Sequence, residues 1–181
     1  RDEGLGDVLR LGARGKVRAE IENILPEKVV AKKSGEVKVS GESVLKAVED
    51  AMVVGCTCLS VGKNPLLKQK NFDIVIVDEA GQISQPAILG PLFLADRFVL
   101  VGDHMQLPPL VRSEKAGKAG LSVSLLRRLA EKFQGEDAVV QLTLQYRMHG
   151  DICALVNAVC YNGLLKCGTE EVKSRTIVYR E

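Results

Sequence analysis

The sequence predicts an α/β protein with a mostly parallel sheet, and three observations support this class. Its strongest apolar stretches are short and continuous, which is typical of strands buried on both faces of a parallel sheet. Helix-forming stretches lie between several of these runs at the spacing of β–α–β units. Polar residues follow the runs directly, at the strand ends where open parallel sheets bind their ligands. The expected architecture is therefore a parallel sheet flanked by helices.

The expected strands are four apolar runs. Residues 52–58 form a β-type run that ends in small polar side chains, and residues 73–77 contain four β-branched residues in succession. Residues 98–101 and 139–144 are the third and fourth runs. Each of these runs is short, as buried strands usually are.

The expected helices occupy the stretches between and around these strands. Pro26 is expected to end the first helix, and a serine near position 122 is expected to cap the fourth. Residues 29–39 are ambiguous, and a solvated connector suits them better than a basic binding patch. The predicted helices are residues 17–25, 43–50, 85–94, 121–133 and 152–159.

Composition bounds the function. The 181 residues are 46% hydrophobic and 27% charged, which suits one globular domain or one domain with part of a second. The net charge of +2 does not indicate a strongly basic surface that binds many phosphate groups. The aromatic content of 4% argues against a broad surface of rings on which bases stack. No run of eighteen apolar residues occurs, so no membrane partner is expected. Five cysteines without a C-x-x-C pair predict reduced thiols in an intracellular compartment rather than a zinc site.

Three polar segments follow the expected strands and form the candidate site. Asp78-Glu79 follows the second run, residues 102–106 follow the third, and residues 145–147 follow the fourth. Two adjacent carboxylates suit a nucleotide hydrolase, because one can position Mg²⁺ while the other orients or deprotonates water. A lone Asp-Glu pair at a strand end more often caps the next helix. Three different polar strand ends in series favour a site.

Three motifs then carry a specific resemblance. Val77-Asp78-Glu79-Ala80-Gly81-Gln82, Val101-Gly102-Asp103-His104-Met105-Gln106-Leu107-Pro108-Pro109 and Gln145-Tyr146-Arg147-Met148-His149 resemble motifs II, III and IV of superfamily 1 helicases. The match is to the 5′-to-3′ branch, which includes the RNA helicase of nonsense-mediated decay. Residues 83–93 most resemble the replication nuclease-helicases that trim Okazaki-fragment flaps. The similarity runs from about residue 51 to about residue 168.

The resemblance implies a role for each matching residue at a site for ATP and Mg²⁺. Asp78 would hold Mg²⁺ through its water shell, and Glu79 would be the general base. Gln106 would contact the γ-phosphate, and the Arg147 guanidinium would stabilise charge on the transferred phosphoryl group. The remaining members of the nucleotide site are Gly102, which allows a tight turn, and Asp103.

Other residues have weaker assignments. The resemblance places Thr57 and Cys58 near single-stranded nucleic acid, although Thr57 could equally be a strand-end hydroxyl bonded to backbone. Tyr146 fits either base stacking or packing beneath Arg147. His104 and His149 flank the second and third motifs and could approach phosphate or DNA, although neither has a partner at ligand spacing.

One expected motif is absent. No segment fits G-x-x-x-x-G-K-[ST], so the loop that cradles the β- and γ-phosphates is missing. We therefore expect an interior part of a longer ATP-driven motor. Residues 1–50 would be a connector or helical segment of the first motor domain, residues 51–144 the RecA-like first domain with motifs II and III, and residues 145–181 the start of a second RecA-like domain.

The resulting functional expectation is part of a DNA helicase, with a nuclease elsewhere in the protein, that acts in replication and repair. ATP hydrolysis would drive movement on single-stranded or flapped DNA, in the nucleus if the source is eukaryotic, and the isolated part would be inactive. Two alternatives stay open: an RNA helicase of the same branch, and a RecA-like binding module that does not hydrolyse ATP.

Overall fold

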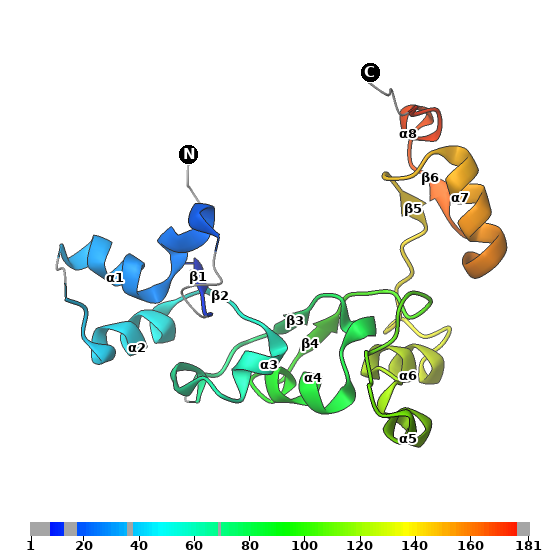
Figure 1. Ribbon diagram of the computed structural model, residues 1–181. Coiled ribbons are helices and arrows are strands. Elements are labelled where there is room, and N and C mark those ends of the chain that lie inside the picture. The colour runs from blue at the N-terminus through cyan, green and yellow to red at the C-terminus, as the bar shows by residue number, and fades with distance from the viewer. Residues whose placement is uncertain (1–7, 13–17, 36–37, 69, 177–181) are drawn as a thin grey trace.

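The computed structural model describes residues 8–12, 18–35, 38–68 and 70–176. Figure 1 shows three lobes in chain order, with an extended segment leading into the C-terminal one. All strand pairs among the described residues are parallel, as predicted, but they form three separate two-stranded sheets, β1–β2, β3–β4 and β5–β6. The expected parallel pairing is confirmed, whereas one continuous sheet is not observed.

The N-terminal lobe covers residues 8–55. Strand β1 pairs with β2 in a register that places Leu9 opposite Val54. Pro26 begins α1 instead of only ending the preceding helix, because its fixed φ and missing N–H suit the first helical position. The expected helix 17–25 is a short 3₁₀ helix, and its residue 17 lies outside the described residues. The elements are β1 (Val8–Arg10), η2 (Ala19–Ile24), α1 (Pro26–Ser34), α2 (Gly41–Asp50) and β2 (Val53–Gly55).

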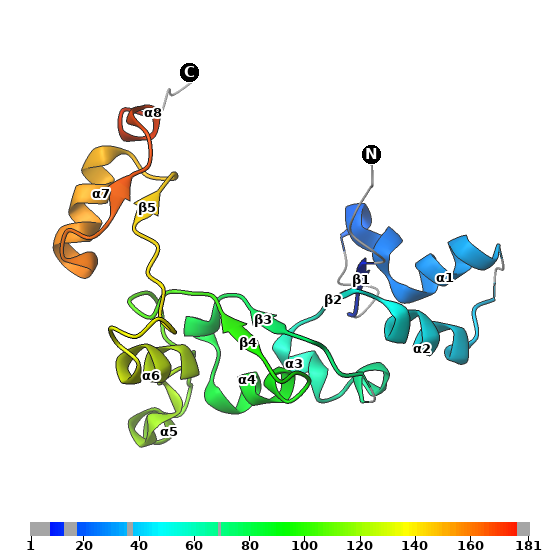
Figure 2. The same cartoon turned by 180° about the vertical axis from the view of Figure 1, so that it is seen from behind.

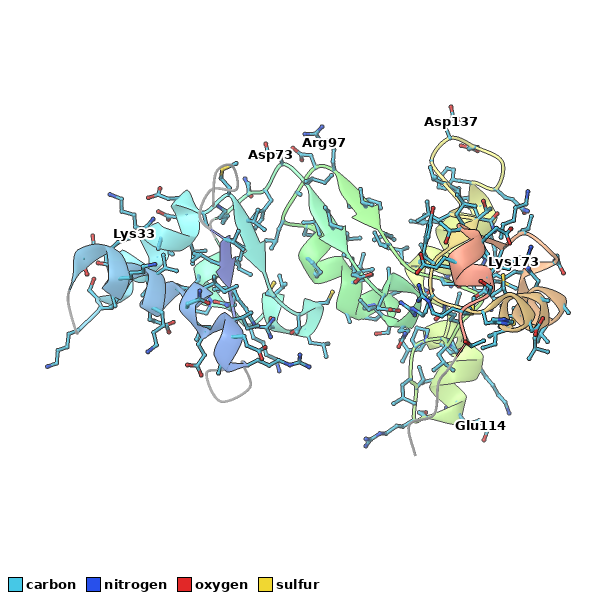
Figure 3. All side chains as sticks on the ribbon, turned by 90° about the horizontal axis from the view of Figure 1, so that it is seen from above. Lys33, Asp73, Arg97, Glu114, Asp137 and Lys173 are labelled. Atoms are coloured by element: carbon cyan, nitrogen blue, oxygen red, sulfur yellow. The ribbon has the colours of Figure 1, made fainter. Side chains whose placement is uncertain are left out.

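The central lobe follows and contains most of the candidate site. Strand β3 pairs with β4, and Figure 3 shows labelled Asp73 and Arg97 at the edge where these strands begin. The cap of helix α6 is Ser124, two residues after Ser122 and so near the expected position, and its hydroxyl accepts the Arg127 N–H (3.1 Å). The elements are α3 (Cys58–Val61), η3 (Pro65–Leu67), β3 (Val75–Val77), η4 (Ala80–Gln82), α4 (Gln85–Leu92), β4 (Phe98–Leu100), α5 (Glu114–Ala116), η5 (Gly117–Leu121) and α6 (Leu125–Lys132).

The C-terminal lobe begins later than the sequence predicted. Of the expected strand 139–144, only its last residue is in a strand, and Val140 and Leu142 are 79% and 82% exposed. The reason is that this segment pairs with β6 of its own lobe rather than with the central sheet. The elements are β5 (Leu144–Gln145), α7 (Gly150–Val156), η6 (Asn157–Tyr161), β6 (Lys166–Cys167) and α8 (Glu170–Lys173).

Apolar burial is divided between two clusters. The first core joins the N-terminal lobe to α3 and η3, and its buried members are Leu9, Leu11, Val48, Ala51, Val61 and Leu67. The second core lies under β3 and β4 and has the buried members Val77, Ala80 and Ile88. A cavity of about 180 Å³, lined by residues of both β2 and β3, lies between the two sheets.

Only one face of the β3–β4 sheet is covered by the described residues. Figures 1 and 2 show from opposite sides that α3 and α4 lie on the same side of this sheet. Side chains on the opposite face are 43–65% exposed, namely Ile74, Ile76, Val99 and Val101. None of the described helices is long and apolar enough to span a bilayer.

Candidate active site

The carboxyl ends of β3 and β4 hold the first two motifs side by side. Beyond the strands, the Val101 N–H donates to the Val77 carbonyl oxygen (2.8 Å) and the Ala80 N–H donates to the Val101 carbonyl oxygen (2.9 Å). These bonds extend the parallel ladder into both loops. Asp78-Glu79 and residues 102–106 therefore leave the sheet at one edge, as the sequence predicted.

Glu79 has an unusual backbone. Its φ of 52° and ψ of 34° are left-handed, a conformation that costs a residue with a side chain on the order of 1–3 kcal/mol. The Asp78 carboxylate accepts the Glu79 N–H (2.9 Å), and the Gln82 side-chain amide donates to Glu79 Oε2 (2.9 Å). The local bonds therefore hold the turn in place, and both carboxylates stay exposed to solvent.

Asp103 organises the loop after β4. Its carboxylate accepts three hydrogen bonds, from the Met105 N–H (2.9 Å), the Gln106 side-chain amide (2.9 Å) and the Tyr161 hydroxyl (2.6 Å). Burial raises the pKa of Asp103, but these hydrogen bonds and nearby His104 outweigh it, and the net pKa is lowered. Asp103 therefore stays ionised through the neutral range and fixes the Gln106 amide.

Two glycines let the loops approach each other. A Cβ on Gly81 would lie 2.7 Å from the Asp103 carbonyl oxygen, and one on Gly102 would lie 3.0 Å from the backbone nitrogens of Ala80 and Gly81. Neither contact leaves room for a methyl group unless backbone shifts. This explains why Gly102 is a glycine, and it assigns the same packing role to Gly81, which the sequence reasoning did not single out.

Gly81→Ala should loosen this contact. The added methyl group must push the loop of Asp103 away, at a cost of about 1–3 kcal/mol for overpacking. Hydrogen exchange measures this directly, and the Ala80 and Val101 amides should exchange faster in the variant. Gly62→Ala is the matched control, because a Cβ there meets nothing within 4 Å. Equal exchange in both variants would contradict the contact.

The third motif is built around Gln145 at the end of β5. The Gln145 side-chain oxygen accepts the N–H groups of Arg147 (2.8 Å) and Met148 (2.6 Å), while its amide donates to the Met148 carbonyl oxygen (2.8 Å). Gln145 thus shapes the turn that presents Arg147, a role the sequence reasoning did not assign. Arg147 is exposed, and its guanidinium makes no hydrogen bond or ion pair with any described residue. The structure does not join Arg147 to Glu79.

Tyr146 packs on the backbone of its own lobe. A Cβ on Gly168 would overlap the Tyr146 ring, so the ring lies directly against this glycine. Tyr146 is 58% exposed, and its observed contact is with Gly168 rather than the expected one beneath Arg147, so base stacking stays a prediction.

The remaining candidates lie at different places. Thr57 precedes α3, is exposed, and accepts the Ser60 hydroxyl through its carbonyl oxygen (2.7 Å). Cys58 packs against the second core, and burial raises the pKa of its thiol. His104 is exposed beside Asp103. His149 caps α7, since its Nδ1 accepts the Asp151 N–H (3.1 Å).

The donor set fits a metal only together with a substrate. Among the described residues, no three His, Cys, Asp or Glu side chains cluster closely enough to hold a metal by themselves. Mg²⁺ is usually bound through one or two carboxylates together with substrate phosphates. Asp78 is exposed, and one of its oxygens is free of hydrogen bonds within the described part of the chain, so this residue fits that mode.

Comparisons with known proteins agree with the expected resemblance. One family model described as an AAA domain matches residues 14–114, and a second AAA domain model matches residues 121–180. The chain is 45% identical over 170 residues to the DNA replication ATP-dependent helicase/nuclease DNA2 of Xenopus laevis, covering 93% of this chain and 15% of that protein. It is 43% identical to the human protein of that name over 173 residues (95% and 16%) and 41% identical to that of Saccharomyces cerevisiae over 171 residues (94% and 11%). The chain thus spans about one sixth or less of the length of these relatives.

Proposed function

Because the chain belongs to the AAA domain family, we propose that it supplies the ATP-hydrolysing residues of a DNA helicase/nuclease of replication and repair. The observation that carries the proposal is the pair of exposed carboxylates after β3, one of them held in a left-handed turn beside the loop of Asp103 and Gln106. Glu79 stands at the N-cap position of η4, but its side chain makes no capping hydrogen bond there. Moreover, Ser84 rather than Asp78 or Glu79 is the N-cap of α4.

In this proposal each residue has one task. The Glu79 carboxylate accepts the proton of the attacking water, and Gln82 orients that carboxylate through its hydrogen bond. Gln106, fixed by Asp103, places an amide beside the same edge of the sheet. Asp78 would hold Mg²⁺, which neutralises phosphate charge when bound.

Arg147 completes the set from the other lobe. Its guanidinium fork matches the charge that develops on a transferred phosphoryl group. Since the structure does not join Arg147 to Glu79, the turn that carries Arg147 would have to move toward Glu79 before hydrolysis. Residues 51–144 would be most of a RecA-like first motor domain, residues 145–181 the start of the second, and residues 1–50 a connector.

The proposed substrate is single-stranded or flapped DNA in the nucleus of a eukaryotic cell. The relatives are named for DNA replication, and this name supports DNA over RNA. Thr57, Cys58 and His104 are the proposed contacts to the strand. The other parts of the motor, including the phosphate loop, would come from the same longer chain.

The decisive assay is ATP hydrolysis by the full-length protein. We expect turnover that requires Mg²⁺, rises on addition of single-stranded DNA and disappears on chelation with EDTA, because carboxylates and phosphates repel each other unless a metal ion lies between them. Stronger stimulation by RNA would favour the RNA helicase. The absence of hydrolysis under all conditions would favour a binding module and contradict the proposal.

A further inference from the structure

One side-chain hydrogen bond connects the candidate site to the C-terminal lobe. The Tyr161 hydroxyl donates to Asp103 Oδ2 at 2.6 Å, although the two residues are 58 positions apart. A hydroxyl bonded to a carboxylate at this distance belongs to the strong, charge-assisted class. Nothing in the sequence pattern around residue 161 pointed to such a contact.

Contacts within the C-terminal lobe fix the position of Tyr161. It is the last residue of η6, and the chain turns sharply there through Asn162, whose φ is 49°. The Asn157 side chain fixes the returning segment by two bonds to the backbone of Leu165 (2.8 and 2.9 Å). The Tyr161 pKa is raised by the bond to Asp103 and by burial, so the hydroxyl keeps its proton.

The same helical segment leads back to Arg147. Helix α7 begins after its cap His149, two residues beyond Arg147, and runs into η6 without a break. Movement of Tyr161 along this segment therefore accompanies movement of the turn that presents Arg147.

In the central lobe, the atom that accepts the Tyr161 hydrogen bond also accepts one from Gln106. Both donate to Asp103 Oδ2, at 2.6 and 2.9 Å. When Tyr161 leaves, water can replace it, and the orientation of the carboxylate that fixes Gln106 is no longer set by the C-terminal lobe.

We propose that Tyr161 is a positioning residue that couples the C-terminal lobe to Gln106 through Asp103. This proposal rests on the proposed ATPase function. Through this coupling, the position of the C-terminal lobe affects the hydrolysis residues of the central lobe. Tyr161 touches no reacting atom in this scheme.

The test is Tyr161→Phe in the full-length protein, since this change keeps the ring and removes the hydroxyl. We expect DNA-stimulated kcat to fall by about 10-fold, within the range for a hydrogen bond to a charged group. KM for ATP should change little, and the number of ATP molecules consumed per base pair unwound should rise. A merely structural role would reduce the fraction of active enzyme without changing this ratio.

A double-mutant cycle with Asp103→Asn identifies the partner. The effects of Tyr161→Phe and Asp103→Asn should be strongly non-additive, because the second change has little left to remove. Tyr146→Phe removes the same group from a tyrosine of the same lobe whose hydroxyl has no hydrogen bond within the described part of the chain, and it should be additive with Asp103→Asn.

The outcomes separate the two proposals. A wild-type protein that hydrolyses ATP, together with a Tyr161→Phe variant of unchanged kcat and unchanged ATP-to-base-pair ratio, overturns the coupling alone. Additive effects in the Tyr161–Asp103 cycle do the same. A wild-type protein without ATP turnover overturns both the coupling and the proposed function.

Discussion

Glu79→Gln should reduce DNA-stimulated ATP turnover of the full-length protein by about 10²- to 10⁴-fold, the range in which a general base contributes. Glutamine is nearly isosteric, so the left-handed turn and the contact with Gln82 should persist while the proton acceptor is lost. ATP binding should remain, since binding does not need the base. Steady-state hydrolysis and equilibrium binding of a fluorescent ATP analogue measure the two quantities separately.

The matched control is Glu136→Gln, which makes the same change at an exposed carboxylate after α6. Its turnover should equal that of the unmodified protein. If Glu79→Gln also keeps full turnover, Glu79 is not the base. A loss of ATP binding equal to the loss of turnover would instead place Glu79 in the binding of nucleotide.

Arg147→Ala should lower turnover by about 10³-fold or more, as expected for an arginine that stabilises the charge on a transferred phosphoryl group. A loss of turnover in this variant can be separated from a loss of stability. The Arg147 guanidinium bonds no described residue, and Gln145 holds the turn instead. Removing the side chain should therefore leave the fold of the lobe unchanged. The measurement is kcat under saturating DNA and ATP, with circular dichroism to verify the fold.

Arg147→Lys distinguishes charge from geometry. Lysine keeps the positive charge but loses the planar fork, so only a minor part of the activity should return. Full activity in Arg147→Lys would mean that a point charge suffices. Full activity in Arg147→Ala would remove Arg147 from the reaction altogether.

The sequence predicted the positions of the strands and helices better than it predicted which strands pair in one sheet. The run 73–77 contains β3, because its four consecutive β-branched residues favour strands, and the continuous apolar run 98–101 contains its partner β4. The predicted single sheet is replaced by three two-stranded sheets in the described part of the chain. Strand order depends on contacts between distant residues, which the periodicity of the sequence does not encode. Pro26 is instructive, because the same residue that ends one helix is suited to begin the next.

Some residues of the candidate site could likewise be identified from the sequence, and others could not. Asp78, Glu79 and Gln106 were found because strand ends of a parallel sheet meet at one edge. Gln145 was also found as part of the third polar segment, although its role in shaping the turn of Arg147 was not. Tyr161 could not, because its hydrogen bond to Asp103 joins residues 58 positions apart. Whether these residues act as proposed stays a prediction.

The division of apolar burial into separate cores has a thermodynamic consequence. The first and second cores share no buried residue, and the C-terminal lobe buries Cys153 and Val172 on its own. Cooperative two-state unfolding is usual for small single domains and is often lost in chains that contain several separately packed parts. Because the first core joins the N-terminal lobe to α3 and η3, these two lobes are expected to lose structure together. The C-terminal lobe can unfold separately, so no single free energy of unfolding describes the chain. Each substitution is best understood through the local opening energy of its own lobe.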